Sequence, residues 1–275
     1  MKRPSKIGLF FCLLGCVGVT SAQSDSIQVA PNELLVKAAL SLLDTPYQAN
    51  TLEVNDEEQL VVNLQAVDCM TFVEYCLALS RAAQYATSGE DYFIRELRYI
   101  RYRGGIIDNY TSRLHYTIDW ITDNINKGVI EDLTHALGGK KYQQPVSFMS
   151  SHPELYPALR KNPQDVEAMK QIEQAINTRH TYYYIPTHEI REKQSLIKSG
   201  DIICFTTNHA GLDISHVGIA YWNKGQLTFI HASSVQKKVI INPEALADYC
   251  VKIKNNTGIM VLRVLVVNHE NGVSE

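Results

Sequence analysis

The order of the secondary-structure patterns predicts an α+β fold. Helical patterns dominate the chain up to about residue 185, and short β-rich runs dominate the remainder. Helices first and antiparallel strands afterwards is the order typical of that class. The chain of 275 residues is long enough for a full hydrophobic core, and it contains no internal repeat and no obvious linker. We therefore expect a leader at 1–22 and one domain over residues 23–275.

Apolar residues recur at helical spacing in several segments. The segment 69–86 begins directly after Asp68, a residue type that favours the N-cap of a helix. Four prolines between residues 143 and 163 predict a loop there. The predicted helices are 33–44, 69–86, 90–102, 116–128, 163–177 and the short 243–250.

The last third of the chain alternates β-rich runs with turns of Gly, Asn and Lys. These runs are rich in β-branched and aromatic residues, and each is short enough to be a single strand. They predict an antiparallel meander on which the earlier helices pack. The predicted strands are 200–207, 215–222, 227–233, 237–242 and 258–265.

The N-terminus has the three parts of a secretory signal peptide. "MKRPSK" is basic, "IGLFFCLLGCVGV" is apolar but short for a membrane span, and "TSA" offers small residues for cleavage before Gln23. An alternative is a lipoprotein signal, since "LLGC" resembles a bacterial lipobox in which Cys16 is acylated. Both interpretations predict export to the periplasm or cell envelope, with a lipid at Cys16 as the one expected membrane contact.

The charge of the chain argues against nucleic acid as a partner. Removal of the leader takes away Lys2, Arg3 and Lys6 and no acid, so the net charge falls by three, from −3 to −6. Binding of a phosphate backbone requires a basic surface instead.

Four cysteines remain after the leader, and their spacing fits neither a zinc site nor a disulfide scaffold. They are Cys69, Cys76, Cys204 and Cys250. There is no HExxH pattern either, so we expect no metal and no cofactor. A cysteine on an amphipathic helix is often a core residue, and Cys69 therefore has two interpretations, a packed side chain or a reactive thiol.

Its position favours the reactive interpretation. The free N–H groups at a helix N-terminus stabilise a thiolate and lower its pKa, and the N–H of Cys69 itself can hold an oxyanion. His216 and His231 lie at the ends of neighbouring predicted strands. One ring can then act as the base for Cys69. The other can hydrogen-bond to the ring nitrogen of that base that points away from the thiol, as the third member of a triad does.

The motifs around these residues resemble a known family. "DC-x-T-F-V-E", "SGDIICF", "SHVGIAY" and "IHAS", in this order, are similar to the NlpC-type papain-like cysteine peptidases of bacterial cell walls. "TPYQANTLE", "RYRGGIIDNYTSRLHYTIDWI" and "GLDISHVGIAY" resemble the N-acetylmuramoyl-L-alanine amidase-like branch. The resemblance runs from about Leu42 to about Val264. It implies a papain-like fold with the nucleophile at a helix N-terminus, an antiparallel sheet or open barrel, and extra helical insertions. It also places the catalytic set on Cys69, His216 and His231.

Further roles are implied by the same resemblance. Tyr47 takes the place of a tyrosine whose hydroxyl faces the oxyanion, together with the Cys69 N–H, although its distance along the chain from Cys69 is longer than in ordinary relatives. Asp68 matches a residue that helps bind the stem peptide, and it is equally suited to cap the helix. Met70 departs from the Ser or Thr that most relatives carry after the cysteine.

The stretch "YTSRLHY" is a second candidate region. Arg113 suits a stem-peptide carboxylate because its planar fork pairs with one through two hydrogen bonds. Ser112, His115 and Tyr116 can hydrogen-bond sugar or peptide, and Ser215 lies beside the base as a candidate pocket hydroxyl. The alternatives are an ordinary solvated loop and, for Ser215, a strand-edge residue.

The resemblance therefore implies a hydrolase of peptidoglycan or its muropeptide fragments that works through a thioester, and we expect the protein to be a monomer. The favoured bond joins the lactyl group of N-acetylmuramic acid to L-alanine. Three alternatives stay open: cleavage of the D-glutamyl–diamino acid bond by an endopeptidase, a non-catalytic wall-binding module, and an acyltransferase.

Overall fold

The computed structural model describes residues 29–85, 89–179 and 181–268. Over these ranges the chain forms an α+β fold with an antiparallel sheet, as the order of patterns predicted. The leader, including Cys16, lies outside the described residues. No helix within the described ranges is long and apolar enough to span a membrane.

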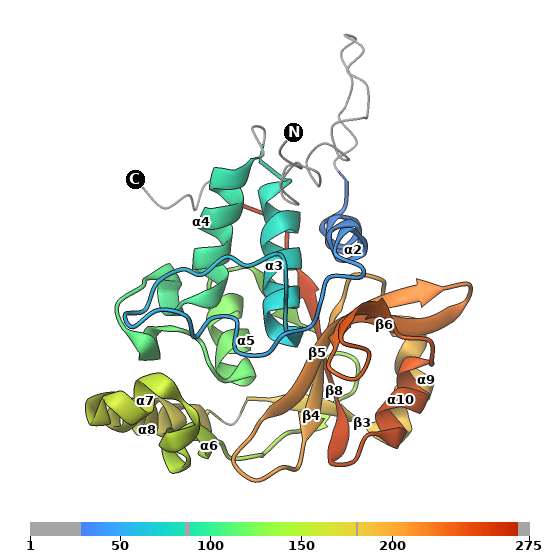
Figure 1. The fold of residues 1–275 in the computed structure, drawn as a ribbon. Coiled ribbons are helices and arrows are strands. Elements are labelled where there is room, and N and C mark those ends of the chain that lie inside the picture. Colours follow the sequence, from blue (N-terminus) through green and yellow to red (C-terminus); the bar gives the residue numbers. More distant parts are fainter. Residues whose placement is uncertain (1–28, 86–88, 180, 269–275) are drawn as a thin grey trace.

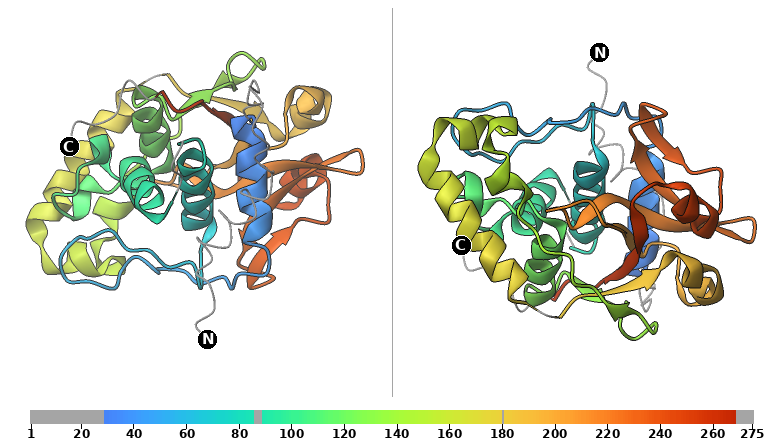
Figure 2. Two further views of the ribbon diagram at one scale, coloured as in Figure 1. Left: turned by 90° about the horizontal axis from the view of Figure 1, so that it is seen from above. Right: turned by 90° about the horizontal axis from the view of Figure 1, so that it is seen from below.

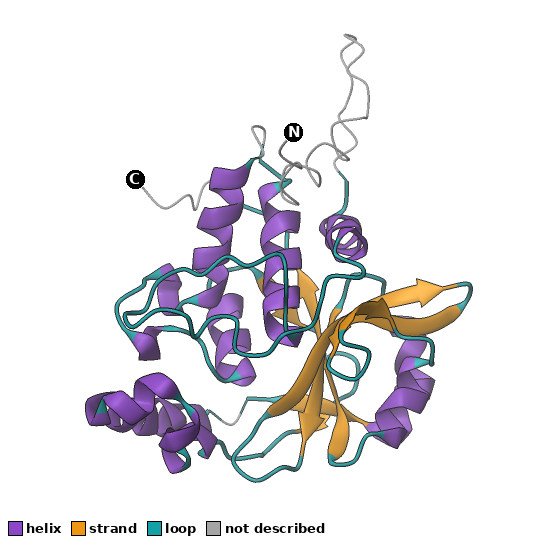
Figure 3. Cartoon of the chain, viewed as in Figure 1, coloured by secondary structure: helices purple, strands orange, loops and turns teal. Residues whose placement is uncertain are grey.

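Eight strands form one antiparallel sheet in the order β2-β3-β8-β4-β5-β6-β7, with β1 paired to β8. Figure 3 shows the strands in orange and the helices around them in purple. The last strand of the chain is therefore internal, between β3 and β4. The simple meander that the sequence predicts holds for β4 to β7. The strands are β1 (Ile130–Asp132), β2 (Lys140–Lys141), β3 (Tyr183–Pro186), β4 (Ile202–Thr207), β5 (Ile214–Asn223), β6 (Gln226–Ser233), β7 (Lys238–Ile241) and β8 (Asn256–Val264).

Helices cover both faces of this sheet. α2 and α4 flank α3 on one side, while α9 and α10 lie on the other (Figures 1 and 2). The α-helices are α2 (Pro31–Ser41), α3 (Cys69–Ala82), α4 (Glu90–Arg101), α5 (Thr117–Asn126), α6 (Phe148–Ser151), α7 (Pro157–Lys161), α8 (Pro163–Asn177), α9 (Ile190–Lys193) and α10 (Leu246–Lys252). Short 3₁₀ turns include η1 (Arg103–Gly105) and η2 (Tyr110–Ser112).

The central helix is α3, which is buried at every residue from 71 to 82. Its apolar side chains pack on α2, α4 and strands β5 and β6. Two charged residues within it are neutralised by arginine–glutamate pairs, Glu74 with Arg101 at 2.7 Å and Arg81 with Glu96 at 2.6 Å. A buried charge without such a partner costs several kcal/mol, so these pairs let a charged helix occupy the core.

Two features differ from the sequence-based expectation. The stretch 143–163 is not a plain loop, since it contains the short helices α6 and α7, the latter beginning at Pro157. Proline is tolerated in the first turn of a helix, where its missing N–H has no partner in any case. Strands β1, β2 and β3 were also not predicted, because each has only two to four residues.

Candidate active site

Cys69 is the first residue of α3, and Asp68 is its N-cap. The Asp68 carboxylate accepts the N–H of Thr71 at 2.8 Å, and the Thr71 hydroxyl accepts the N–H of Asp68 at 2.9 Å. This reciprocal pair, a capping box, begins the helix at a defined residue. It therefore fixes the cysteine at the end of the helix, where its side chain is half-buried and not packed away in the core.

The two histidines meet across neighbouring strands, as the sequence predicted. His216 lies on β5 and His231 on β6, and the two rings stand nearly perpendicular, at 86°. His216 Nε2 lies 2.7 Å from His231 Nδ1, which is a hydrogen bond between the rings. His216 is half-buried, whereas His231 is 3% exposed. The more deeply buried His231 ring therefore contacts His216 at its Nε2 atom.

The thiol lies against the strand that carries the first histidine. A hydrogen bond from the backbone N–H of Val217, the neighbour of His216, reaches the Cys69 thiol. The N–H groups of Met70 and of Cys69 itself also reach it. The N-terminus of α3 and the start of β5 thus converge on the sulfur, with β6 behind them.

The expectation of a lowered thiol pKa is wrong for the unliganded protein. Burial first, and then the adjacent Asp68 carboxylate, raise the pKa of Cys69 to about 12. The three backbone N–H groups lower the pKa but do not outweigh these two effects. Burial also lowers the pKa of His216 to about 4. Both changes favour a neutral thiol beside a neutral imidazole.

His231 is also held neutral. Burial first, and then the nearness of His216, lower its pKa to about 3. Its ring lies among aromatic side chains, with the Phe229 centroid at 4.5 Å and the Tyr249 centroid at 6.1 Å. Its Nε2 atom is buried and has no hydrogen-bond partner among the described residues. Within that part of the chain, the polar contact of this ring is therefore the one to His216.

Tyr47 is placed by the segment that leads into α3. An isolated parallel bridge joins it to Val67, two residues before the cysteine. Burial raises the pKa of the Tyr47 hydroxyl, and the Cys69 and Asp68 charges raise it further. The Tyr47 hydroxyl therefore lies close enough to Cys69 to interact with it electrostatically.

Other residues singled out near the nucleophile have structural contacts. The Asp68 carboxylate caps α3, which is the alternative that the sequence had left open. Met70 is half-buried and packs against the main apolar cluster. Ser215 is exposed, and its hydroxyl donates to the Phe205 carbonyl at 3.3 Å.

Arg113 does not present an open guanidinium. Its side chain is almost fully buried, and it pairs with Glu53 at 2.6 Å and with Glu58 at 3.5 Å. Its guanidinium also lies over the Tyr110 ring, 5.0 Å from the centroid. These contacts tie the segment between Tyr47 and Cys69 to the second candidate region. Free carboxylate binding by Arg113 would require the two glutamates to be displaced.

The remaining residues of that region also bond within the protein. His115 Nε2 lies 2.8 Å from the Tyr110 carbonyl, and burial lowers the pKa of His115 to about 3. The Tyr116 hydroxyl donates to Glu173 at 2.7 Å and accepts the Met149 N–H at 2.9 Å. The Ser112 hydroxyl donates to the Asn109 carbonyl at 2.6 Å. The structure does not bring this set to Cys69 as a cluster of free polar groups.

One buried carboxyl near the site was not singled out from the sequence. Asp213 accepts the N–H of Ile118 at the start of α5, at 2.7 Å. Burial raises the pKa of Asp213 to about 6, although backbone hydrogen bonds act against this rise. It therefore joins α5 to the start of β5, three residues before His216. Its place in "GLDISHVGIAY", directly before the strand that carries His216, is the signal that the sequence offered.

Among the residues that the structure describes, no group of three or more His, Cys, Asp or Glu side chains is arranged to hold a metal ion. The four described cysteines are free thiols. Apart from Cys69, they are fully buried, which is typical of packing residues.

Comparisons with known proteins show the family of this chain. The sequence model of the N-acetylmuramoyl-L-alanine amidase-like family matches residues 37–259. A crystal structure of an N-acetylmuramoyl-L-alanine amidase from Bacteroides uniformis is 40% identical in sequence and has a TM-score of 0.81. The match covers 86% of this chain and 99% of that one. No curated protein matches the chain.

Two further structures extend the comparison. A Bacteroides fragilis protein, provisionally named a xylanase, is 45% identical, with a TM-score of 0.79 over 82% of this chain and 99% of that one. A Legionella pneumophila protein is 22% identical, with a TM-score of 0.66 over 95% and 93% of the two chains, and it shows likeness of fold alone. On the extent of the family match and the identity to the B. uniformis enzyme, this chain belongs to the N-acetylmuramoyl-L-alanine amidase-like family.

Proposed function

We propose that this protein is a cysteine-dependent N-acetylmuramoyl-L-alanine amidase with an NlpC-type papain-like fold. The observation that carries the proposal is the convergence of three elements on one sulfur. The Cys69 thiol at the start of α3 receives the N–H of Val217, and the neighbouring His216 is hydrogen-bonded at 2.7 Å to His231. A nucleophile, a base and a group that orients the base are the parts that acyl transfer through a thioester requires.

The protonation states define the first step. His216 Nε2 faces His231, so the nitrogen left for the thiol is Nδ1. For Nδ1 to accept a proton, Nε2 must carry the ring hydrogen and donate it to His231 Nδ1. The proton of His231 is then on its own Nε2. In this arrangement His231 fixes both the tautomer and the orientation of the base.

Attack proceeds by general base catalysis from the neutral pair. His216 Nδ1 takes the thiol proton while the sulfur bonds to the lactyl carbonyl carbon of N-acetylmuramic acid. The Cys69 N–H and the Tyr47 hydroxyl stabilise the oxyanion. His216 then gives the proton to the nitrogen of L-alanine as the C–N bond breaks. Water, deprotonated by the same ring, hydrolyses the thioester and restores the thiol.

The raised thiol pKa is compatible with this order of events. A thiolate formed in advance would be buried beside the Asp68 carboxylate, which is unfavourable. In the proposed order, negative charge develops as the C–S bond forms. It passes to the carbonyl oxygen of the substrate, which the Cys69 N–H and the Tyr47 hydroxyl stabilise. The His216–His231 pair then carries the positive charge transiently.

The provisional name of the B. fragilis relative raises glycoside hydrolysis as a competing reaction. That chemistry uses a pair of carboxyl groups on either side of the glycosidic bond. Here the carboxylate beside Cys69 belongs to Asp68, and it is committed to the helix cap. A thiol with an oriented imidazole supports amide hydrolysis instead.

The proposal extends to location and substrate form. The leader supports export to the periplasm or cell envelope, either as a soluble protein or with a lipid on Cys16. The protein acts as a monomer on peptidoglycan or on muropeptides released from it, with soluble fragments preferred.

Product analysis tests the proposal. The mature protein is incubated with an N-acetylmuramoyl tetrapeptide, and the products are identified by mass spectrometry, with Cys69→Ala as the control. Free tetrapeptide and N-acetylmuramic acid are expected. N-acetylmuramoyl-L-Ala-D-Glu and a dipeptide would identify an endopeptidase, and transfer to an added amine would identify an acyltransferase. The proposal fails if cleavage survives loss of the thiol, or if the wild-type protein binds muropeptides without cleaving them.

A further inference from the structure

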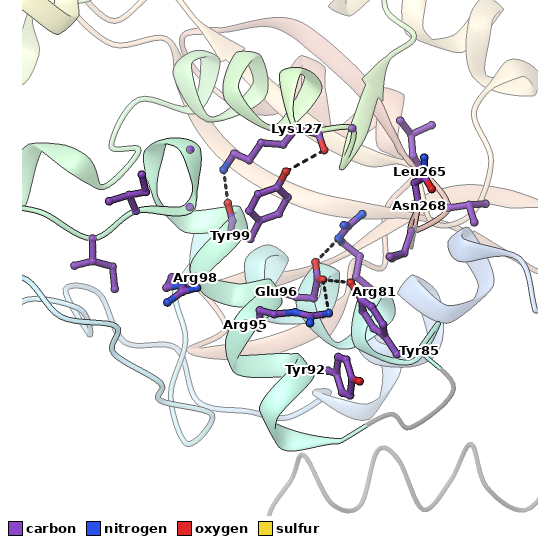
Figure 4. A pocket seen from close by; sticks show the side chains of 17 residues that line it. Arg81, Tyr85, Tyr92, Arg95, Glu96, Arg98, Tyr99, Lys127, Leu265 and Asn268 are labelled. Carbon is purple, nitrogen blue, oxygen red and sulfur yellow. Dashed lines mark hydrogen bonds and ion pairs between the residues drawn. The ribbon is translucent and has the colours of Figure 1, made fainter. Parts of the chain in front are cut away.

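A cavity of about 1070 Å³ lies near the opposite end of α3 from Cys69. It is enclosed by the C-terminal end of α3, the helix α4, the η1 turn and the segment after β8 (Figure 4). Arg81 lines it twelve residues after Cys69, which corresponds to about 18 Å along the helix axis. The cavity is therefore separate from the candidate active site.

The lining of this cavity is cationic, although the whole chain has a net charge of −3. Three arginines line it with one carboxylate, that of Glu96, and Lys127 lines it too but is paired with Asp123; the arginines are Arg81, Arg95 and Arg98. Glu96 accepts Arg81 Nε at 2.6 Å and the Tyr85 hydroxyl at 2.5 Å. The Glu96 carboxylate is therefore already paired within the protein, and the arginines leave the lining of the cavity with a net positive charge.

The arginines keep hydrogen-bonding capacity for a ligand. Arg81 is 5% exposed, and its Nη1 is buried without a hydrogen-bond partner among the described residues. Figure 4 places its guanidinium between the Glu96 carboxylate and the segment that ends at Asn268. Arg95 is held over two tyrosine rings, with its guanidinium carbon 4.6 Å from the Tyr85 centroid and 4.7 Å from that of Tyr92.

Arg95 and Arg98 remain accessible from solvent. The Arg95 side chain is 41% exposed, and Arg98 is exposed on the same helix, three residues further along. Lys127 contributes charge but no spare hydrogen, because its ammonium group donates to the carbonyls of Tyr99 and Tyr102 and pairs with Asp123. Hydrogen-bond donation to a ligand therefore falls to the arginines.

Four aliphatic side chains also line the cavity. Ile106 and Ile107 follow η1, Leu265 and Val266 follow β8, and Ile106 and Val266 are 68% and 55% exposed. These are among the most exposed large apolar residues in the described part of the chain. Exposed aliphatic groups and arginines in one cavity form an amphipathic pocket, which suits an anion attached to an apolar body.

We propose that this cavity binds the C-terminal carboxylate of a short peptide with small aliphatic side chains. The planar fork of an arginine pairs with a carboxylate through two hydrogen bonds, and the aliphatic side chain of the peptide would pack against aliphatic residues that line the cavity. A free phosphate fits less well, since it has no apolar part to contact those residues. This site goes beyond the proposed hydrolase function and does not depend on Cys69.

Calorimetric titration of the mature Cys69→Ala protein tests the site independently of turnover. The probe is N-acetyl-L-alanyl-L-valine, and its C-terminal amide and inorganic phosphate serve as comparisons. The peptide acid is expected to bind at least tenfold more tightly than either. The double variant Arg95→Gln/Arg98→Gln is expected to weaken its binding at least tenfold. Arg160→Gln, a matched exposed arginine on α7, is expected to leave it unchanged.

A second variant, Ile106→Glu, places a carboxylate at the apolar rim and is expected to abolish binding of the acid without disturbing the core, because this position is exposed. The proposal is overturned if the amide or phosphate binds as tightly as the acid. It is also overturned if the double variant binds the acid within twofold of the parent. Hydrolysis by the same arginine variants in the wild-type Cys69 background should be unchanged, so that failure of one proposal is distinguishable from failure of the other.

Discussion

The candidate active site and the stretch 110–116 both attract attention in the sequence through their polar residues, but these residues have different partners in the structure. At the centre, His216 and His231 contact each other, and Cys69 lies half-buried at a helix end. In the second region, Arg113 is paired with two glutamates. The nearby Tyr116 and His115 also bond to groups of the protein itself.

The difference shows that the partner of a polar side chain decides its role. An arginine suits a carboxylate ligand in isolation, but here the carboxylates of Glu53 and Glu58 occupy that place. Histidines suit many structural roles, and the proton-transfer role proposed for this pair rests on the hydrogen bond between the two rings. Substitutions at the two regions should therefore have opposite effects on activity and on stability.

Cys69→Ala has the largest expected effect. Removing the nucleophile should lower kcat for the muropeptide by at least about 10³-fold, since the remaining contributions are binding and oxyanion stabilisation. The thermal unfolding midpoint should change little, because the side chain is half-buried at a helix end. Kinetics and calorimetry on one preparation measure both. A folded variant with activity near the parent would show that this centre is not the catalytic one.

Arg113→Ala tests the second region in the opposite way. It leaves Glu53 and Glu58 without their partner in a mostly buried position, so the free energy of unfolding should fall by about 3–5 kcal/mol. Urea unfolding measures this loss, and Arg113→Lys, which keeps the charge, should lose less. If Arg113 instead binds the stem peptide, the Ala variant will unfold normally and show a raised KM.

His231→Ala sharpens the comparison within the centre. Without its Nδ1, the His216 ring loses the contact that fixes its tautomer, and kcat should fall by about 10²-fold or more with little change in KM. His231→Asn should recover part of the rate, because the amide oxygen can accept the hydrogen of His216 Nε2. Equal losses in the two variants would mean that His231 acts only by filling space.

The pH dependence of thiol alkylation gives a smaller and finer effect. With the pKa of Cys69 near 12, its labelling rate should rise about tenfold per pH unit between pH 7 and pH 10, because the thiolate fraction rises in that proportion. Asp68→Asn removes a negative charge but keeps an N-cap acceptor for Thr71, so it should speed labelling at each pH. Cys69→Ala gives the background. A flat rate at neutral pH would indicate a thiolate–imidazolium pair at rest instead.

The parts of the fold that the sequence predicted well are those with local signals. The start of α3 is signalled by Asp68 and Thr71, and the strands around His216 and His231 are signalled by their β-branched and aromatic composition. The predicted meeting of the two rings needed only that successive strands be neighbours. The order β4-β5-β6-β7 satisfies this condition.

The parts that the sequence did not predict depend on distant partners. β3 is a strand because Ile185 pairs with Ile259 of β8, far along the chain, and nothing near it signals the pairing. The Arg113 contacts join positions 60 and 55 residues apart in sequence, so residue type alone could not tell a ligand site from an ion pair. The expectation of a lowered Cys69 pKa was wrong because burial and the Asp68 charge raise this pKa by more than the backbone N–H groups at the helix N-terminus lower it.

The most direct test of the proposed mechanism is to find the acyl group on the sulfur. The wild-type protein is mixed with the N-acetylmuramoyl tetrapeptide, quenched in acid during turnover, and examined by intact-protein and peptide mass spectrometry. We expect an N-acetylmuramoyl adduct on the peptide that contains Cys69, absent from Cys69→Ala. Full turnover with no adduct at any quench time, together with activity in Cys69→Ala, would contradict the mechanism.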